Sequence, residues 1–152
     1  MLPVELFKLL MVVNGSLPIM NSNNEEKKPA FLASLKSRTP LGTNMVVKFD
    51  NVHTNIGNGN DPSTGIFTAP SSGVYQFSCN FIKSDNSFFT ELDLMKNDKP
   101  VVKAHAHNAA FSSGSLQAIL DLKKGERIYI IHPRQEAILY GDDYSMFSGH
   151  ML

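Results

Sequence analysis

The sequence contains few of the residues that cross-link or stiffen small proteins. Its 152 residues include one cysteine, Cys79, so no disulfide can form within the chain. Tryptophan is absent, and ten phenylalanines and four tyrosines supply the aromatic side chains. Glycine occurs 10 times, whereas a collagenous sequence needs about one glycine in three. A collagen-like repeat is therefore excluded within this chain.

The sequence also lacks an excess of charge of either sign. Its 14 Lys+Arg balance 14 Asp+Glu, which gives a formal net charge of zero with the histidines neutral. Domains that bind nucleic acid or anionic membranes usually carry a basic patch, so the sequence predicts neither nucleic-acid binding nor membrane insertion. Hydrophobic residues at 42% and charged residues at 18% are typical of a globular chain, and this length favours one domain.

Long hydrophobic runs are missing at the N-terminus. A secretory signal has a basic start and an uninterrupted apolar core, but here Glu5 precedes the apolar run and Lys8 interrupts it. The run at 9–13 is far too short to span a bilayer. Three interpretations of residues 1–29 stay open: a degenerate signal, a short trimerising helix with heptad spacing, or the remnant of a longer region. The polar stretch at 21–29 indicates a linker, which places the domain boundary at residue 30.

From residue 30 onward the pattern is typical of strands. Tyr75, Phe77, Cys79 and Phe81 alternate with polar residues, and this period of two predicts a half-buried β-strand. Turn residues recur about every ten positions, and no helical pattern lies between them. The sequence therefore predicts an all-β, antiparallel sandwich or barrel. Strands are expected at 45–49, 73–83, 91–94, 116–122, 128–131 and 147–152.

Several motifs resemble the globular head domain of complement C1q and its relatives. The opening AFLASL, the turn LKKGERIYI and the closing FSGHML follow the order of that family over residues 30–152. The GxFxxPxxGxYxF pattern and the closing strand supply the residues expected in the structural core, namely Gly65, Phe67, Pro70, Gly73, Tyr75, Phe77, Phe147 and Gly149. The resemblance implies a ten-strand antiparallel jelly roll of C1q/tumour necrosis factor type. It also implies a compact homotrimer with both termini at one base, here without the collagen stalk of many relatives.

Basic and imidazole side chains are the candidate binding residues. Lys83, Lys103, Arg127 and Arg134 can recognise acidic groups from the expected exposed surface, although for any one of them an ordinary solvated position is favoured. His105 and His107 lie two apart on an expected strand, so they share a face with Lys103. Two imidazoles alone do not complete a zinc site, which takes three or four ligands, and a surface or inter-subunit role is favoured for them. The expected loops are 51–62, 83–87, 107–115 and 132–143.

Calcium is the cofactor that the resemblance raises. Many relatives bind it with a carboxylate in the loop before the strand that reads SGS, but here residues 108–115 contain no Asp or Glu. This departure puts the calcium site of the family in doubt, because calcium prefers several carboxylate oxygens. Asp142 and Asp143 remain candidate metal ligands, although a solvated turn is favoured for them.

Catalysis is not indicated. The sequence has no G-x-S-x-G nucleophile elbow, phosphate loop or dinucleotide fingerprint. The resemblance instead implies a secreted, non-enzymatic recognition module of innate-immune type that binds microbial surfaces, glycans or proteins. The alternative is a cytokine-like or structural trimer that binds a cell-surface receptor.

Overall fold

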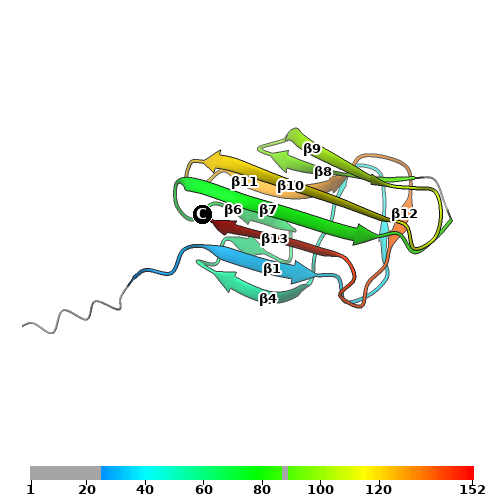
Figure 1. The fold of residues 1–152 in the computed structure, drawn as a ribbon, viewed down its shortest axis with the longest axis horizontal. Coiled ribbons are helices and arrows are strands. Elements are labelled where there is room, and N and C mark those ends of the chain that lie inside the picture. Colours follow the sequence, from blue (N-terminus) through cyan, green and yellow to red (C-terminus); the bar gives the residue numbers. More distant parts are fainter. Residues whose placement is uncertain (1–24, 87–88) are drawn as a thin grey trace, which may run out of the picture.

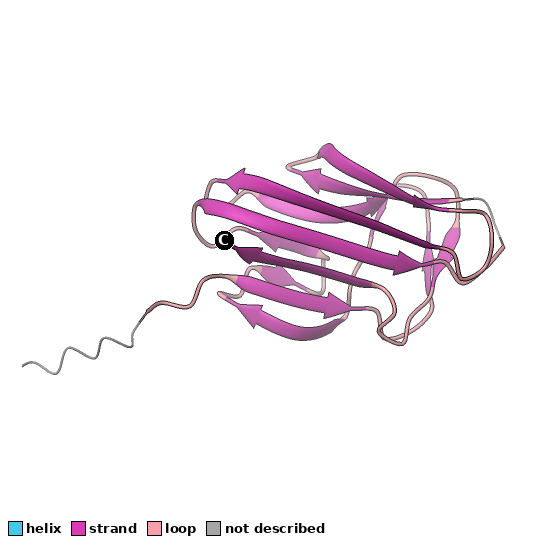
Figure 2. Ribbon diagram, in the orientation of Figure 1, coloured by secondary structure: helices cyan, strands magenta, loops and turns pink. Residues whose placement is uncertain are grey.

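The computed structural model describes residues 25–86 and 89–152, and these fold into two antiparallel sheets packed face to face (Figures 1 and 2). No helix occurs among the described residues, so none of them forms a helix that could span a membrane. The predicted all-β antiparallel jelly roll is confirmed. The described residues form 13 strand segments, where ten strands were expected, and five of these segments have only two or three residues.

The first sheet has five strands in the order β10-β7-β13-β1-β4. Their bounds are β1 Ala30–Ser34, β4 Asn51–Ile56, β7 Gly73–Ile82, β10 Ser113–Leu122 and β13 Met146–Met151. The second sheet follows the order β5-β6-β11-β8-β9, and β3 also pairs with β11. Its strands are β3 Met45–Val46, β5 Asn60–Asp61, β6 Ile66–Thr68, β8 Thr90–Lys96, β9 Lys99–Ala106 and β11 Arg127–His132. A small third sheet joins β2 Thr39–Leu41 to β12 Ala137–Leu139.

Aromatic rings from both sheets form the core. Phe31 of β1 lies 4.9 Å from both Phe67 of β6 and Phe147 of β13, measured between ring centroids. Phe77 of β7 packs on the same group, 5.5 Å from Phe67. The predicted inward face of β7 is confirmed, because its alternate residues from Tyr75 to Phe81 are all buried. The sequence motif is therefore a packing motif, and its rings join the two layers.

Gly149 shows why one core position of β13 must lack a side chain. A Cβ atom placed there would lie 2.6 Å from Cδ1 of Phe77 and 2.7 Å from Cε1 of Phe31. Gly65 has a different role, because its φ of +77° lies in the left-handed region that glycine adopts at little cost. Both glycines belong to the predicted motif. Close contacts exclude a Cβ atom at Gly149, and the backbone conformation disfavours one at Gly65.

Some expected boundaries were wrong. The segment 51–62, expected as a loop, contains β4 and β5, and β4 forms the polar edge of the first sheet. Of the strand expected at 45–49, only Met45–Val46 belongs to β3, although the Val47 amide also donates to the Ile130 carbonyl over 2.9 Å and both Val47 and Phe49 are buried. The loop expected at 132–143 contains β12. These short or polar strands give too few alternating residues for the sequence pattern to show.

The two ends of the described chain meet at one end of the sandwich. The Met151 amide donates to the Pro29 carbonyl over 2.9 Å, and Lys28 Nζ donates to the Leu152 carbonyl over 3.0 Å. Figure 1 shows the chain entering beside the C-terminus. This agrees with the expected common base, and it leaves the loops 107–112 and 140–145 at the opposite end. The expectations for residues 1–24 lie outside the described residues.

Candidate functional site

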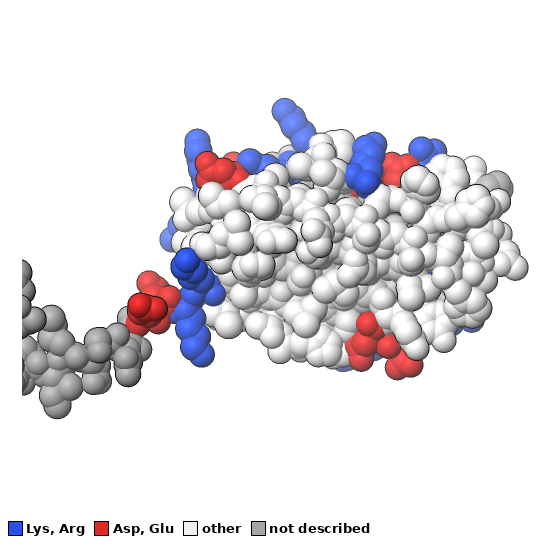
Figure 3. All heavy atoms as spheres, viewed as in Figure 1, with Lys and Arg blue, Asp and Glu red and all other residues white. Residues whose placement is uncertain are grey.

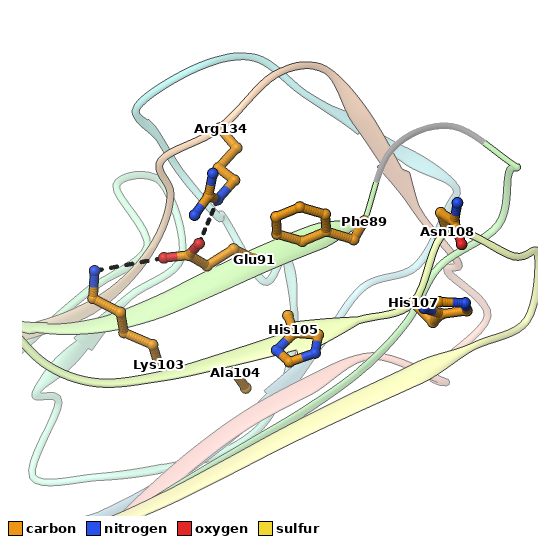
Figure 4. A pocket seen from close by; sticks show the side chains of 8 residues that line it. All are labelled: Phe89, Glu91, Lys103, Ala104, His105, His107, Asn108 and Arg134. Carbon is orange, nitrogen blue, oxygen red and sulfur yellow. Dashed lines mark hydrogen bonds and ion pairs between the residues drawn. The ribbon is translucent and has the colours of Figure 1, made fainter.

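A pocket lies on the outward side of the second sheet, between the hairpin β8–β9 and the loop that follows β11 (Figure 4). Its volume of about 650 Å³ is within the range of small-molecule sites. It contains four of the six predicted binding residues. The lining residues are Phe89, Glu91, Lys103, Ala104, His105, His107, Asn108 and Arg134.

Ion pairs link the charged residues of this pocket. Arg134 Nε donates to Glu91 Oε2 over 2.5 Å, and Lys103 Nζ lies 3.5 Å from both Glu91 Oε1 and Asp93 Oδ2. The side chains of Arg134 and Lys103 are 53% and 57% exposed, whereas those of Glu91 and Asp93 are 11% and 5% exposed. The carboxylates are therefore nearly covered, whereas the cations reach solvent, although the formal charges of the four side chains sum to zero.

The pKa values of the Glu91 and Asp93 carboxyl groups shift in opposite directions. Burial alone would raise the pKa of Glu91, but the hydrogen bond from Arg134 and the charges of Arg134 and Lys103 outweigh it and lower that pKa. Burial raises the pKa of Asp93, and the neighbouring Glu91 adds to this rise, while Lys103 opposes it. Glu91 thus contacts both cations, and Asp93 contacts Lys103 alone.

Aromatic rings complete the wall of the pocket. The Arg134 guanidinium lies 4.8 Å from the centroid of the Phe89 ring, in cation–π contact. The His105 ring approaches Phe89 edge-on, with 6.1 Å between centroids. His107 and Asn108 line the end of the pocket nearest the loop after β9. The prediction that His105 and His107 share a face with Lys103 is confirmed, although His107 lies one residue beyond β9.

The sequence reasoning did not select Phe89, Glu91 or Asp93 as site residues. Glu91 and Asp93 lie directly opposite His105 and Lys103 in the β8–β9 pairing. Opposite charges at such cross-strand positions stabilise the pairing of two strands. The register of the hairpin therefore determines which basic side chain lies opposite each acid. The strand expected at 91–94 contains both acids, but their partners depend on the register of the hairpin.

Two predicted binding residues lie outside the pocket. Arg127 Nη2 pairs with Asp98 Oδ2 at 3.2 Å, and the Tyr129 hydroxyl donates to the same carboxylate over 2.7 Å. Lys83 was expected in an exposed loop, and that expectation was wrong. Its side chain is fully buried, with Nζ 3.7 Å from Asp85 Oδ1. In this fold Lys83 faces the interior because it continues the buried end of β7.

Asp142 and Asp143 occupy a tight turn between β12 and β13, with φ of 51° and 64°. Asp143 Oδ1 accepts hydrogen bonds from Ser34 Oγ at 2.5 Å and Asn51 Nδ2 at 2.9 Å, and these lower its pKa. The Ser34 hydroxyl lies between Asp143 and His53, whereas a hydrolytic triad needs the histidine between serine and acid. The described residues contain no group of three or more His, Cys, Asp or Glu that could hold a metal. Calcium binding here stays a prediction.

The first sheet presents an outward face almost without charge. Its five strands contain one formally charged residue, Asp121, against seven in the second sheet. Figure 3 shows this face as a broad uncharged area with charged side chains around its margin. Val74 and Ile119 are exposed on it. We call this surface the uncharged face.

Aromatic side chains form a cluster at the end of the uncharged face away from the termini. Phe111 and Tyr144 are 70% and 55% exposed, and Tyr140 lies between them. Ring centroids are 5.8 Å apart for Phe111 and Tyr140 and 5.0 Å apart for Tyr140 and Tyr144. Phe111 has a φ of 63°, which is unusual for a bulky residue. We call these three residues the aromatic cluster.

Comparison with known proteins places this geometry in a family. A profile of the C1q domain matches residues 30–152. The chain belongs to the C1q domain family. This C1q domain is 33% identical over 128 residues to Caprin-2 of Danio rerio, and the alignment covers 81% of this chain and 14% of that protein. It is 34% identical over 131 residues to Complement C1q tumor necrosis factor-related protein 3 of Mus musculus, and this alignment covers 84% of this chain and 52% of that protein. The chain thus spans about half or less of these relatives.

Solved structures show the same fold. The globular domain of zebrafish complement 1qA superposes on this C1q domain with a TM-score of 0.66 and 22% identity, covering 82% of this chain and 98% of that one. Murine APRIL superposes with a TM-score of 0.66 and 15% identity, covering 83% and 100%. Membership of the C1q family supports an extracellular binding or recognition module in general.

Proposed function

We propose that this C1q domain is a secreted, non-enzymatic recognition module that assembles as a homotrimer and binds microbial surfaces, glycans or proteins in innate immunity. The observation that carries this proposal is the separation of charge between its two sheets. One sheet offers the uncharged face, and the other offers the pocket with outward-facing cations. A module that joins copies of itself and also binds a ligand needs two surfaces of different chemistry.

Self-assembly is supported by the uncharged face. In a symmetric homo-oligomer each residue near the axis meets its own copies, so a charge placed there is repelled by an identical charge. The five strands of this sheet carry only Asp121, whereas the whole chain has 28 formally charged residues. The aromatic cluster at its end has the composition of interface anchors, because Tyr and Phe are enriched in the buried centres of interfaces.

Secretion is compatible with the single cysteine. Cys79 is fully buried in β7, and burial raises the pKa of its thiol well above its usual range. The thiol is therefore protected from the oxidation that exposed cysteines undergo outside the cell.

The second candidate function is a cytokine-like or structural trimer for a cell-surface receptor. The exposed ring of Phe111 favours it if assembly leaves part of the aromatic cluster uncovered.

One combined experiment tests these functions. The mass of the purified chain is measured by light scattering, and the same sample is screened on a glycan array, on bacterial surfaces and on cultured cells. We expect three times the protomer mass and binding to microbial or glycan surfaces. Tight, saturable binding to cells without glycan binding supports the receptor candidate instead. A monomer that binds none of these surfaces would contradict both.

A further inference from the structure

We propose that the pocket beside Arg134 binds an acidic saccharide, through a carboxylate or sulfate group of the sugar. This inference rests on the proposed function, because it names the ligand class of one surface of the recognition module. It follows from the arrangement of charge, rings and hydrogen-bonding groups around the cavity drawn in Figure 4.

The cations are placed to meet an anion from solvent. The two carboxylates beneath them are nearly covered, while more than half of each basic side chain is exposed. Arg134 uses only Nε for its hydrogen bond to Glu91. Its Nη1 and Nη2 donate no hydrogen bond to any residue that the structure describes. These two nitrogens can donate side by side to two oxygens of a carboxylate or sulfate.

The pocket is held in shape before any ligand enters. Glu91 and the Phe89 ring fix the Arg134 guanidinium, and the two carboxylates fix Lys103 Nζ. Long basic side chains otherwise lose considerable conformational entropy when they bind, so this fixation lowers the cost of association. An exposed arginine with no such partners would form a weaker site.

The remaining wall favours a sugar over a bare anion. The rings of Phe89 and His105 offer apolar surface for the C–H groups of a sugar ring. Asn108 and His107 offer an amide and an imidazole that can hydrogen-bond to hydroxyl groups. A volume of about 650 Å³ also exceeds what a single carboxylate or sulfate occupies. The combination of cations, rings and amide matches a saccharide that carries an acidic group.

The test uses matched ligands and matched variants of the full chain. The ligand is a sulfated tetrasaccharide containing uronic acid, and its control is the same tetrasaccharide after desulfation and carboxyl reduction. Arg134→Gln removes one positive charge in the pocket, and Arg127→Gln removes one outside it. Titration calorimetry should show about tenfold weaker binding or more for Arg134→Gln, because a charge-assisted pair is lost. Arg127→Gln should stay within about twofold of the unaltered chain.

Several results would overturn the proposal. Equal binding of the neutral tetrasaccharide would indicate a site for uncharged sugars, and equal losses for Arg127→Gln and Arg134→Gln would indicate diffuse attraction. Tighter binding of a poly-glutamate peptide would indicate an acidic protein as partner. If none of these probes binds while the surface screen is positive, the saccharide site fails and the recognition function stands. If Arg134→Gln does not fold, Arg134→Lys decides, since it keeps the charge but loses the paired donors and should bind less tightly.

Discussion

Phe111 presents its ring to solvent from a backbone conformation that disfavours its side chain. Its φ of 63° lies in the left-handed region, where a residue other than glycine loses about 1–2 kcal/mol. The loop holds this conformation because the Phe111 amide donates to the Lys83 carbonyl over 2.8 Å and Ser112 Oγ donates to the His107 carbonyl over 2.7 Å. The ring is 70% exposed, so it contributes little to the fold of one protomer. We therefore expect it to contribute to assembly.

Two substitutions separate these contributions. Phe111→Ala removes the ring and keeps the strain, whereas Phe111→Asn removes the ring and relieves the strain, because asparagine tolerates the left-handed region. An aromatic side chain buries about 150–250 Å², so covering the exposed 70% removes roughly 100–175 Å² from water. At about 25 cal/mol/Å² this stabilises each contact by about 2.5–4.4 kcal/mol. Both variants should therefore weaken association by about two to three orders of magnitude.

The variants should differ in folding. Phe111→Asn should unfold with a free energy about 1 kcal/mol higher than that of Phe111→Ala, measured with denaturant at a concentration where both are monomeric. Sedimentation over a concentration series gives the association constants. Val101→Ser is the matched control, because it removes an exposed apolar side chain from β9 on the other sheet. Unchanged association in both Phe111 variants, or an equal loss in Val101→Ser, would refute this reasoning.

Three further predictions concern the core and the tight turn. Cys79 should react with a thiol reagent only after unfolding, because burial raises its pKa; fast labelling of the native chain would contradict this. Gly149→Ala should lower the free energy of unfolding by about 1–3 kcal/mol, since the new Cβ would lie 2.6 Å from Phe77, and an unchanged denaturation midpoint would show that the core yields freely. The pKa of Asp143 is lowered by the hydrogen bond from Ser34, so its stabilising effect is present above the unfolded pKa, near 3.9, and is lost as pH falls through the folded value. Melting temperatures of Asp143→Asn should therefore fall less steeply below about pH 4, and parallel profiles would contradict this.

The inward face of β7 could be predicted because it needs only local information. Apolar and polar residues alternate without interruption from Tyr75 to Phe81, and a strand side chain points to the opposite face from its neighbour. The pattern therefore identified Tyr75, Phe77, Cys79 and Phe81 as core residues before any partner strand was known. The short strands could not be found in this way, because β3 and β5 have two residues each and no periodicity.

The pocket could not be predicted from the sequence because it depends on an irregular register. The turn between β8 and β9 was visible, and its residues Asn97 and Asp98 both have positive φ, as the tight hairpin turn requires. Counting back from that turn would pair Glu91 with Ala104 and place an acid on the face of a small, partly buried residue. A bulge between Leu94 and Met95 shifts the pairing by one, so that Glu91 meets His105. Pro100 lies beside the bulge and cannot donate a hydrogen bond to the ladder, but proline also occurs at the start of an edge strand, so this residue alone does not fix the register.

The zero net charge of the chain is distributed unevenly between two surfaces, the uncharged face and the pocket with its exposed cations. In the proposed function the uncharged face is covered by another copy of the chain, whereas the pocket stays open to its ligand. They lie on the outward sides of different sheets, with the aromatic core between them. Sites that share no partners act independently in double-mutant cycles. Substitutions at Phe111 and Arg134 should therefore combine additively in the free energy of unfolding of the protomer. In the proposed trimer, several pockets would raise the apparent affinity for a surface that repeats the ligand, so we expect coupling between the two substitutions only in binding to such a surface.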